Sequence, residues 1–425
     1  MKNATLDLVL RLKRRIALGL LLLAVPAAAY GETPSPVTAK PEEVGLSSTQ
    51  LQKIQAATEQ NIKDGLIPGA VMLVARRGKV AWVSAQGRQT PDSDASMKYD
   101  SIFRIYSMTK PLTSITLMQL VEEGRLQVSD PVEKYLPELG KMKVGTEVVV
   151  EGKPTLHLAD PDRPMTVQDL LRHTSGLTYG SRGATLVHKA YLDAKIGDRT
   201  ATVEEMVHSL SGVPLLFSPG QRWEYSVAVD VQGRLIEVLT GKKFSEALGE
   251  RVLKPLGMVD TSFQVPAEKL LRVAQPGQKP DGPPMTPRFT VDDGAKYESG
   301  GGGLLSTADD YLHFAQALSN GGTWQGKRII GRKTLEYMTA DHVGARPGRP
   351  DGFGFGLGFE VRTKEGEAGL PGSVGEYGWS GAAGTHFWID PKEQLFAIYM
   401  VQASEGDTRF LNRQFRTMVQ AALIE

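Results

Sequence analysis

The sequence of 425 residues contains no cysteine. This absence excludes a disulfide framework, a thiolate nucleophile, a zinc site with cysteine ligands and an anchor on a lipid-modified cysteine. The fold must therefore be stabilised by its packed core. A chain of this length is long enough for a sizeable core and for two domains.

An excess of charge of one sign is also lacking. The formal net charge is +1 at pH 7, from 49 Lys and Arg and 48 Asp and Glu residues. Nucleic-acid-binding proteins usually carry a basic excess on one face or segment. We therefore expect no nucleic acid partner, and the composition gives no indication of the oligomeric state.

A long hydrophobic run occurs near the N-terminus. Basic residues between Lys2 and Arg15 precede the apolar run IALGLLLLAV (16–25), and the small residues PAAA (26–29) follow it. This order predicts a signal peptide at residues 1–29, with cleavage after Ala29, and hence a periplasmic or secreted protein. The run is short for a membrane span, so stable insertion is not expected after cleavage, with an uncleaved anchor as the alternative.

The pattern of apolar residues predicts an α+β fold. Helical periodicity in 51–65 and 409–424 and strand patterns in 70–87 and in the last hundred residues place both classes of element at the two ends of the chain. We expect an antiparallel sheet flanked by helices, built from residues 40–124 and 299–425. An inserted, mainly helical domain with many loops is predicted for residues 125–298.

The stretch RIYSMTKPL (104–112) contains the S-x-x-K pattern, with Ser107 three residues before Lys110. Pro111 is tolerated only in the first turn of a helix, and the following residues have helical spacing up to Gly124. Ser107 and Lys110 are thus predicted to share one face at a helix N-terminus. The pattern alone is weak, because a chain of this length contains about one such match by chance, and a surface serine beside a solvated lysine is the alternative.

A serine hydroxyl needs a base to become a nucleophile. A lysine serves only when burial or a nearby positive charge favours its neutral form, and a tyrosine could assist it. The histidines are rival bases, but neither H-E-x-x-H nor G-x-S-x-G occurs. His173, in a predicted loop, is interpreted as structural.

Two glycine-rich stretches have no phosphate-binding context. SGGGGLL (299–305) lacks the P-loop pattern, so a tight backbone turn beside a site is expected there. FGFGLGFEV (353–361) has a strand pattern and is predicted to form one strand. Its part FGFGLGF alternates large residues with glycine, so the large side chains would lie on one face.

Five ordered blocks together resemble one family: YSMTK, LRHTSGLTYG, SPGQRWEYS, SGGGGLLSTADDYLHF and GWSGAAGTHFWIDP. They resemble the serine hydrolases related to class C β-lactamases and penicillin-binding DD-peptidases, and most closely the family VIII carboxylesterases. The resemblance extends from about residue 40 to the C-terminus. It implies a β-lactamase-like fold with the active site between the sheet region and the helical domain.

The resemblance also implies roles for individual residues. Ser107 would be the nucleophile, and Lys110 its base and hydrogen-bond partner. Tyr225, in EYSVAVD, would match the tyrosine of the Y-x-N motif, activate Ser107 and protonate the leaving group. The backbone N–H groups of Ser107 and Ala382 would form the oxyanion hole.

Two departures from the family motifs concern the substrate. Val227 replaces the asparagine of Y-x-N, and Trp379-Ser380-Gly381 stands where β-lactamases have K-T-G. The missing lysine would otherwise meet a substrate carboxylate through a charge-assisted hydrogen bond. We therefore expect these four positions to form a substrate-binding region suited to uncharged esters.

The resemblance thus implies a carboxylesterase that hydrolyses short-chain, uncharged, small-molecule esters through an acyl-enzyme, without metal or cofactor. Weak activity on cephalosporins would be compatible with this chemistry. The first alternative is a β-lactamase or DD-peptidase acting on β-lactams or peptidoglycan. The second is a binding module with the same fold and an inactive site, since a fold does not guarantee a function.

Overall fold

The computed structural model describes residues 35–277, 287, 289–291, 294–403 and 408–424. The predicted signal peptide, residues 1–29, lies outside these ranges. In the described ranges, no helix is both long and apolar enough to cross a membrane.

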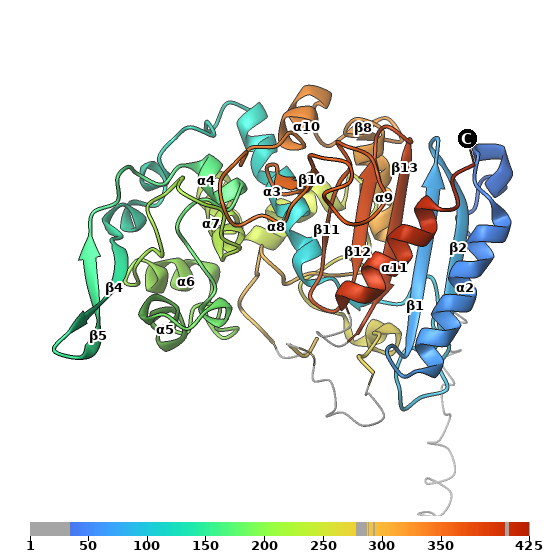
Figure 1. The fold of residues 1–425 in the computed structure, drawn as a ribbon, viewed down its shortest axis with the longest axis horizontal. Coiled ribbons are helices and arrows are strands. Elements are labelled where there is room, and N and C mark those ends of the chain that lie inside the picture. Colours follow the sequence, from blue (N-terminus) through green and yellow to red (C-terminus); the bar gives the residue numbers. More distant parts are fainter. Residues whose placement is uncertain (1–34, 278–286, 288, 292–293, 404–407, 425) are drawn as a thin grey trace, which may run out of the picture. The chain divides into compact units, whose positions relative to one another are not determined.

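A seven-stranded sheet is built from both ends of the chain, as predicted (Figure 1). Its order is β2-β1-β13-β12-β11-β10-β9, and every neighbouring pair is antiparallel. The strands are β1 (Gly69–Arg76), β2 (Lys79–Gly87), β9 (Phe353–Phe355), β10 (Glu360–Arg362), β11 (Tyr377–Ser380), β12 (His386–Asp390) and β13 (Leu395–Val401). The N-terminal hairpin β1–β2 thus continues the C-terminal strands, and the predicted α+β class is confirmed.

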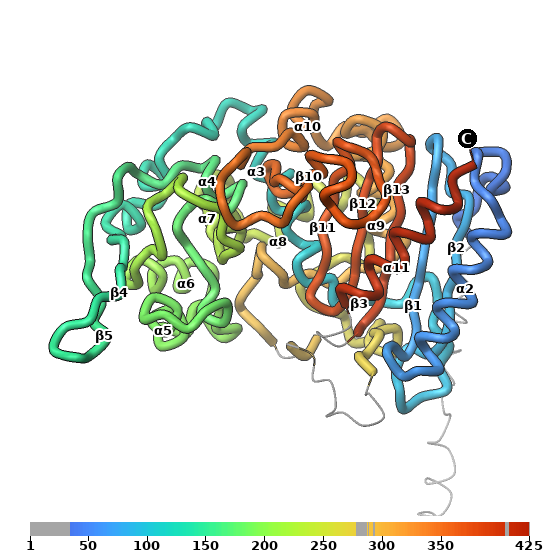
Figure 2. Tube along the Cα trace, in the orientation of Figure 1, coloured from blue at the N-terminus to red at the C-terminus, as the bar shows by residue number. Residues whose placement is uncertain are grey.

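Helices cover both faces of this sheet (Figures 1 and 2). Alternate side chains of a strand point to opposite faces. Met72 and Val74 of β1 join the apolar cluster of α2 (Ser48–Lys63) and α11 (Thr408–Gln420). Val71 and Leu73 join the larger cluster that includes α3 (Thr109–Glu122) and α9 (Ala308–Ser319).

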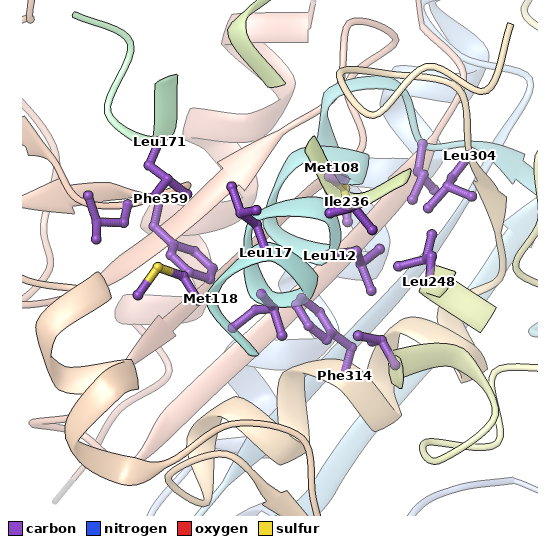
Figure 3. Packing of buried hydrophobic residues seen from close by; sticks show 14 of the residues in the cluster. Met108, Leu112, Leu117, Met118, Leu171, Ile236, Leu248, Leu304, Phe314 and Phe359 are labelled. Atoms are coloured by element: carbon purple, nitrogen blue, oxygen red, sulfur yellow. The ribbon is translucent and has the colours of Figure 1, made fainter. Parts of the chain in front are cut away.

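Helix α3 lies in the centre of the larger cluster. Its residues from Thr109 to Met118 are all buried, and a helix buried on every side is typical of the interior of a protein. Figure 3 shows Leu112, Leu117 and Met118 among side chains from other elements, including Ile236 and Phe314. Any group at the start of α3 is therefore held on a rigid element.

The described part of the middle of the chain contains five α-helices. They are α4 (Val167–Leu171), α5 (Leu186–Asp193), α6 (Val203–Leu210), α7 (Ala228–Thr240) and α8 (Phe244–Leu248). It also contains a hairpin that the sequence analysis did not predict, β4 (Val144–Val150) with β5 (Lys153–Ala159). Residues 35–425 form one compact unit, so the domain boundaries at 125 and 298 stay a prediction.

The prediction of a single strand over 353–361 was wrong. The segment forms two strands, β9 and β10, because the chain reverses between them: the N–H of Gly356 donates to the carbonyl of Phe359 at 2.8 Å. Gly358 adopts a φ of 96°, which side chains disfavour. The large side chains of this stretch are therefore divided between two strands and a turn.

The remaining elements are short. They are β3 (Phe103–Arg104), β6 (Leu305–Ser306), β7 (Thr323–Trp324), β8 (Lys327–Arg328) and α10 (Arg332–Met338). The short 3₁₀-helices are η1 (Pro41–Val44), η2 (Tyr106–Met108), η3 (Val132–Lys134), η4 (Pro137–Lys141), η5 (Gly180–Arg182) and η7 (Ala267–Arg272), and η6 (Gly249–Leu253) is a short π-helix.

Candidate active site

Ser107 lies in η2, the turn that connects β3 to α3. The turn closes with the N–H of Met108 donating to the carbonyl of Ile105 at 3.0 Å, and α3 begins at Thr109. Ser107 therefore precedes the α-helix, and Lys110 lies in its first turn, close to the predicted arrangement. Tyr106, directly before the serine, has a φ of 43°, a strained conformation for a non-glycine residue that is often found at functional sites.

Lys110 is buried, with 1% of its surface exposed. Its Nζ lies 2.5 Å from the carbonyl oxygen of Gly301, 3.2 Å from the hydroxyl of Tyr179 and 3.4 Å from Ser107 Oγ. Among the described residues no carboxylate forms an ion pair with it. The lysine is thus directed at the serine and is enclosed by uncharged oxygen atoms.

Tyr225 comes from the turn before α7. Its hydroxyl donates to Ser107 Oγ at 2.5 Å, and its ring centroid lies 4.4 Å from Lys110 Nζ. The structure therefore brings together Ser107, Lys110 and Tyr225, the three residues selected from the sequence. A short hydroxyl–hydroxyl bond beside a cation is suitable geometry for moving a proton from the serine.

Tyr179 is a second tyrosine at the site, to which the sequence analysis assigned no role. Besides its contact with Lys110, its ring lies 5.5 Å from that of Tyr225. It is the next-to-last residue of the block LRHTSGLTYG, and a hydroxyl-bearing aromatic residue in that block was the available signal. Its side chain comes from a loop whose position could be found only from the fold.

The glycine segment 299–303 forms a tight backbone turn beside the site, as predicted. Gly301 accepts the hydrogen bond of Lys110 through its carbonyl oxygen. A Cβ atom on Gly301 would lie 2.5 Å from Asp230 Oδ2 and 3.1 Å from the Tyr179 hydroxyl. Only glycine fits between these two side chains without displacing one of them.

Aromatic side chains form a wall next to Tyr225. The ring of Trp379, on β11, lies 5.6 Å from Tyr225 and 5.2 Å from Phe355, and Trp223 stacks on Tyr225 at 6.1 Å. Trp379 Nε1 is buried and has no hydrogen-bond partner in the described part of the chain. That Trp379 offers apolar surface to a substrate, as expected from the W-S-G motif, stays a prediction.

The end of β11 lies against the backbone that leads to Ser107. A Cβ atom on Gly381 would lie 2.4 Å from the carbonyl oxygen of Ile105 and 2.1 Å from Thr385 Oγ1. Ala382 follows, and packs against the cluster that contains Tyr106. This approach is compatible with an oxyanion hole from the N–H groups of Ser107 and Ala382, a role that stays a prediction together with substrate contacts of Ser380 and Gly381.

Val227 and His173 are both buried. Val227, 2% exposed, belongs to the main core, so its contact with substrate stays a prediction. His173 has a φ of 58°, and its Nδ1 lies 3.2 Å from Ser226 Oγ. Burial, and after it the positive charge of Lys110, lowers the pKa of His173 well below its usual value. A neutral, enclosed imidazole packed 5.1 Å from the ring of Tyr225 fits the structural role predicted for it.

Over the ranges that the structure describes, no group of three or more His, Asp or Glu side chains is placed to hold a metal ion.

Comparison with known proteins identifies the family of this chain. The family model described as Beta-lactamase matches residues 54–421. Protein Rv1367c of Mycobacterium tuberculosis is 34% identical over 369 residues, which are 82% of this chain and 89% of the relative. Esterase EstB of Burkholderia gladioli is 30% identical over 392 residues, covering 87% of this chain and 95% of the esterase.

A solved structure also matches nearly the whole chain. EstCE1, described as a hydrolase with promiscuous acyltransferase activity, superimposes with a TM-score of 0.72 at 25% identity, covering 89% of this chain and 99% of EstCE1. The chain belongs to the beta-lactamase family of serine hydrolases, in the branch that contains the family VIII carboxylesterases.

Proposed function

We propose that this protein is a carboxylesterase that hydrolyses short-chain, uncharged esters through an acyl-enzyme on Ser107. The observation that carries the proposal is the 2.5 Å hydrogen bond from the Tyr225 hydroxyl to Ser107 Oγ, formed beside the buried Lys110. The names of esterase EstB and of the hydrolase EstCE1 support the same reaction class.

The reaction needs only groups of this chain and water. The Lys110–Tyr225 pair takes the proton of Ser107, and Oγ forms a bond to the ester carbonyl carbon. The backbone N–H groups of Ser107 and Ala382 stabilise the resulting oxyanion. Tyr225 returns the proton to the alcohol as the carbon–oxygen bond breaks, and a water activated by the same pair then releases the acid.

The aromatic wall favours uncharged substrates. Trp379 stands where a β-lactamase has the K-T-G lysine, so at this position a substrate carboxylate would meet apolar surface in place of an ammonium group. A small uncharged ester loses little hydration free energy when it binds against this aromatic wall. We therefore place short, neutral acyl esters ahead of anionic substrates.

The alternative is a β-lactamase or a DD-peptidase, which would use the same acyl-enzyme. Trp379 opposes this alternative because it offers no cation to the substrate carboxylate, and the asparagine of Y-x-N is replaced by the buried Val227. Slow cephalosporin hydrolysis as a side activity remains part of the proposal. For location, the predicted signal peptide supports export to the periplasm or the medium.

Parallel kinetics on purified residues 30–425 test the proposal. We expect fast turnover of p-nitrophenyl butyrate, slow turnover of nitrocefin, and loss of both in Ser107→Ala. Ester turnover that survives Ser107→Ala would overturn the mechanism, and nitrocefin turnover equal to ester turnover would favour the alternative. A fluorophosphonate probe that fails to label the wild type would indicate an inactive site.

A further inference from the structure

Asp230 is a buried carboxylate close to the site but outside the three selected residues. It lies in the first turn of α7, five residues after Tyr225, and only 2% of its surface is exposed. Its Oδ1 accepts hydrogen bonds from Ser299 Oγ at 2.6 Å and from the N–H of Gly301 at 3.1 Å. Burying a carboxylate is costly, so a chain that places one here must bind it well.

Gly301 connects Asp230 to Lys110. The N–H of this glycine donates to Asp230, and its carbonyl oxygen accepts from Lys110 Nζ at 2.5 Å. A single residue therefore faces a carboxylate on one side and an ammonium group on the other. Hydrogen bonds arranged in such a chain polarise and strengthen one another.

The glycine segment is also fixed sterically. A Cβ atom on Gly300 would lie 2.7 Å from the carbonyl oxygen of Val229 in α7, and Thr113 Oγ1 of α3 donates to the carbonyl of Gly300 at 2.8 Å. Helices α3 and α7 thus hold the segment from two sides. The carbonyl of Gly301 cannot turn away from Lys110 unless its bond to Asp230 is broken.

The charge of Asp230 acts within this enclosed region. Burial first, and the negative charge of Asp230 second, raise the pKa of Tyr297 well above its usual value. Lys110 has no direct ion-pair partner among the described residues, and a buried ammonium without compensation is destabilising. The carboxylate of Asp230, which is connected to Lys110 through Gly301, supplies that compensation.

We propose that Asp230 is a positioning residue: through Gly301 it holds Lys110 Nζ between Ser107 and Tyr179. This role rests on the proposed esterase function. Without this hold the Gly301 carbonyl and Lys110 Nζ are less fixed, so catalysis weakens while substrate binding at the aromatic wall is kept. A loss confined to kcat distinguishes this role from a merely structural one.

The test uses Asp230→Asn and Asp230→Ala, with p-nitrophenyl butyrate kinetics from pH 5 to 10. For Asp230→Asn we expect kcat to fall about 10- to 100-fold, with KM changed less than about threefold. The rate at which a fluorophosphonate labels Ser107 should fall by a similar factor.

Two further variants serve as controls. Ser299→Ala removes one hydrogen bond of Asp230 and leaves its charge and its bond to Gly301, so kcat should fall less than in Asp230→Asn. Gly301→Ala forces a methyl group against Asp230 Oδ2 and should lower kcat by itself. Because both changes act through one peptide, Asp230→Asn with Gly301→Ala should lose less than the product of the two single losses.

Unchanged kcat in Asp230→Asn would overturn the proposal, and so would a KM that rises as much as kcat falls. If Asp230→Ala does not fold, the isosteric Asn variant decides. The labelling rate reports on Ser107 without any ester. A wild type that is labelled but hydrolyses no ester would reject the esterase function alone, and the effect of Asp230→Asn on labelling would still decide the role of Asp230.

Discussion

The hydroxyl of Tyr225 donates to Ser107 Oγ at 2.5 Å, although 118 residues separate the two in the sequence. Tyr225 lies just before α7, and Ser107 lies just before α3. The contact exists because α7 packs against α3. Lys110, from the first turn of α3, lies 4.4 Å from the same tyrosine ring. The base that we propose for this site is therefore the pair of Lys110 and Tyr225.

The two tyrosines should differ in their contribution. Tyr225→Phe removes the hydroxyl that meets Ser107, and kcat for p-nitrophenyl butyrate should fall by about 10²- to 10⁴-fold, as expected for loss of a general base or acid. Tyr179→Phe removes a hydroxyl 3.2 Å from Lys110 Nζ, and kcat should fall only about tenfold. Equal losses in the two variants would assign the proton transfer to the lysine, with both tyrosines as its supports.

The sequence predicted the local parts of this site and left its assembly open. The S-x-x-K spacing and Pro111 were enough to place Ser107 and Lys110 on one turn, because both are consequences of helix geometry. Tyr225 was identified only through the resemblance to a family, and Tyr179 was not identified. A tyrosine in a loop has no periodicity, and its contact with Lys110 depends on how distant segments pack.

The fold shows the same division between local and distant information. The strand pattern in 70–87 depends only on neighbouring residues, and the structure has the hairpin β1–β2 there. The hairpin β4–β5 was missed because most of its side chains are exposed, which removes the alternation of apolar and polar residues. The stretch 353–361 was wrongly predicted because glycines that permit a reversal also occur inside strands.

Trp379 should determine the preference for uncharged substrates. Trp379→Lys restores the charge of the K-T-G motif and removes part of the aromatic wall. A charge-assisted hydrogen bond is worth about 1.5–3 kcal/mol, so the ratio of nitrocefin to p-nitrophenyl butyrate turnover should rise by about tenfold or more. Trp379→Phe keeps an apolar ring and should leave the ratio within about threefold. An unchanged ratio in the lysine variant would mean that another part of the site selects the substrate.

Gly381 should be intolerant of any side chain. A Cβ atom there would lie 2.1 Å from Thr385 Oγ1 and 2.4 Å from the carbonyl oxygen of Ile105, so Gly381→Ala must push β11 away from the turn that holds Ser107. We expect kcat to fall by about 10²-fold, the size seen when one oxyanion donor is lost. Gly249→Ala is the control, since a Cβ atom at Gly249 meets no atom within 4 Å. Similar activity in both variants would contradict the close approach.

Asp169 should make stability depend on pH in the acid range. Burial tends to raise its pKa, but hydrogen bonds from Arg163, Thr174 and the backbone of Thr166 outweigh burial and lower the pKa of Asp169 to about 2. Its side chain is fully buried between Arg163 and Arg172. Because the folded-state pKa is below the unfolded value, the stabilisation is complete above about pH 4 and is lost as the pH falls toward 2.

The expected size of this effect follows from the shift. A difference of nearly two pKa units corresponds to about 2 kcal/mol of unfolding free energy at neutral pH. Asp169→Asn removes that contribution and leaves two arginines near a neutral amide, so it should lower the midpoint of thermal unfolding by several degrees at pH 7. The difference in the midpoint of thermal unfolding between Asp169→Asn and the wild type should narrow between pH 4 and pH 2. Asp193→Asn, which breaks an exposed pair with Lys189, should change stability by less than about 0.5 kcal/mol at any pH. A gap that stays constant down to pH 2 would show that packing, and not the charge of Asp169, stabilises this corner of the fold.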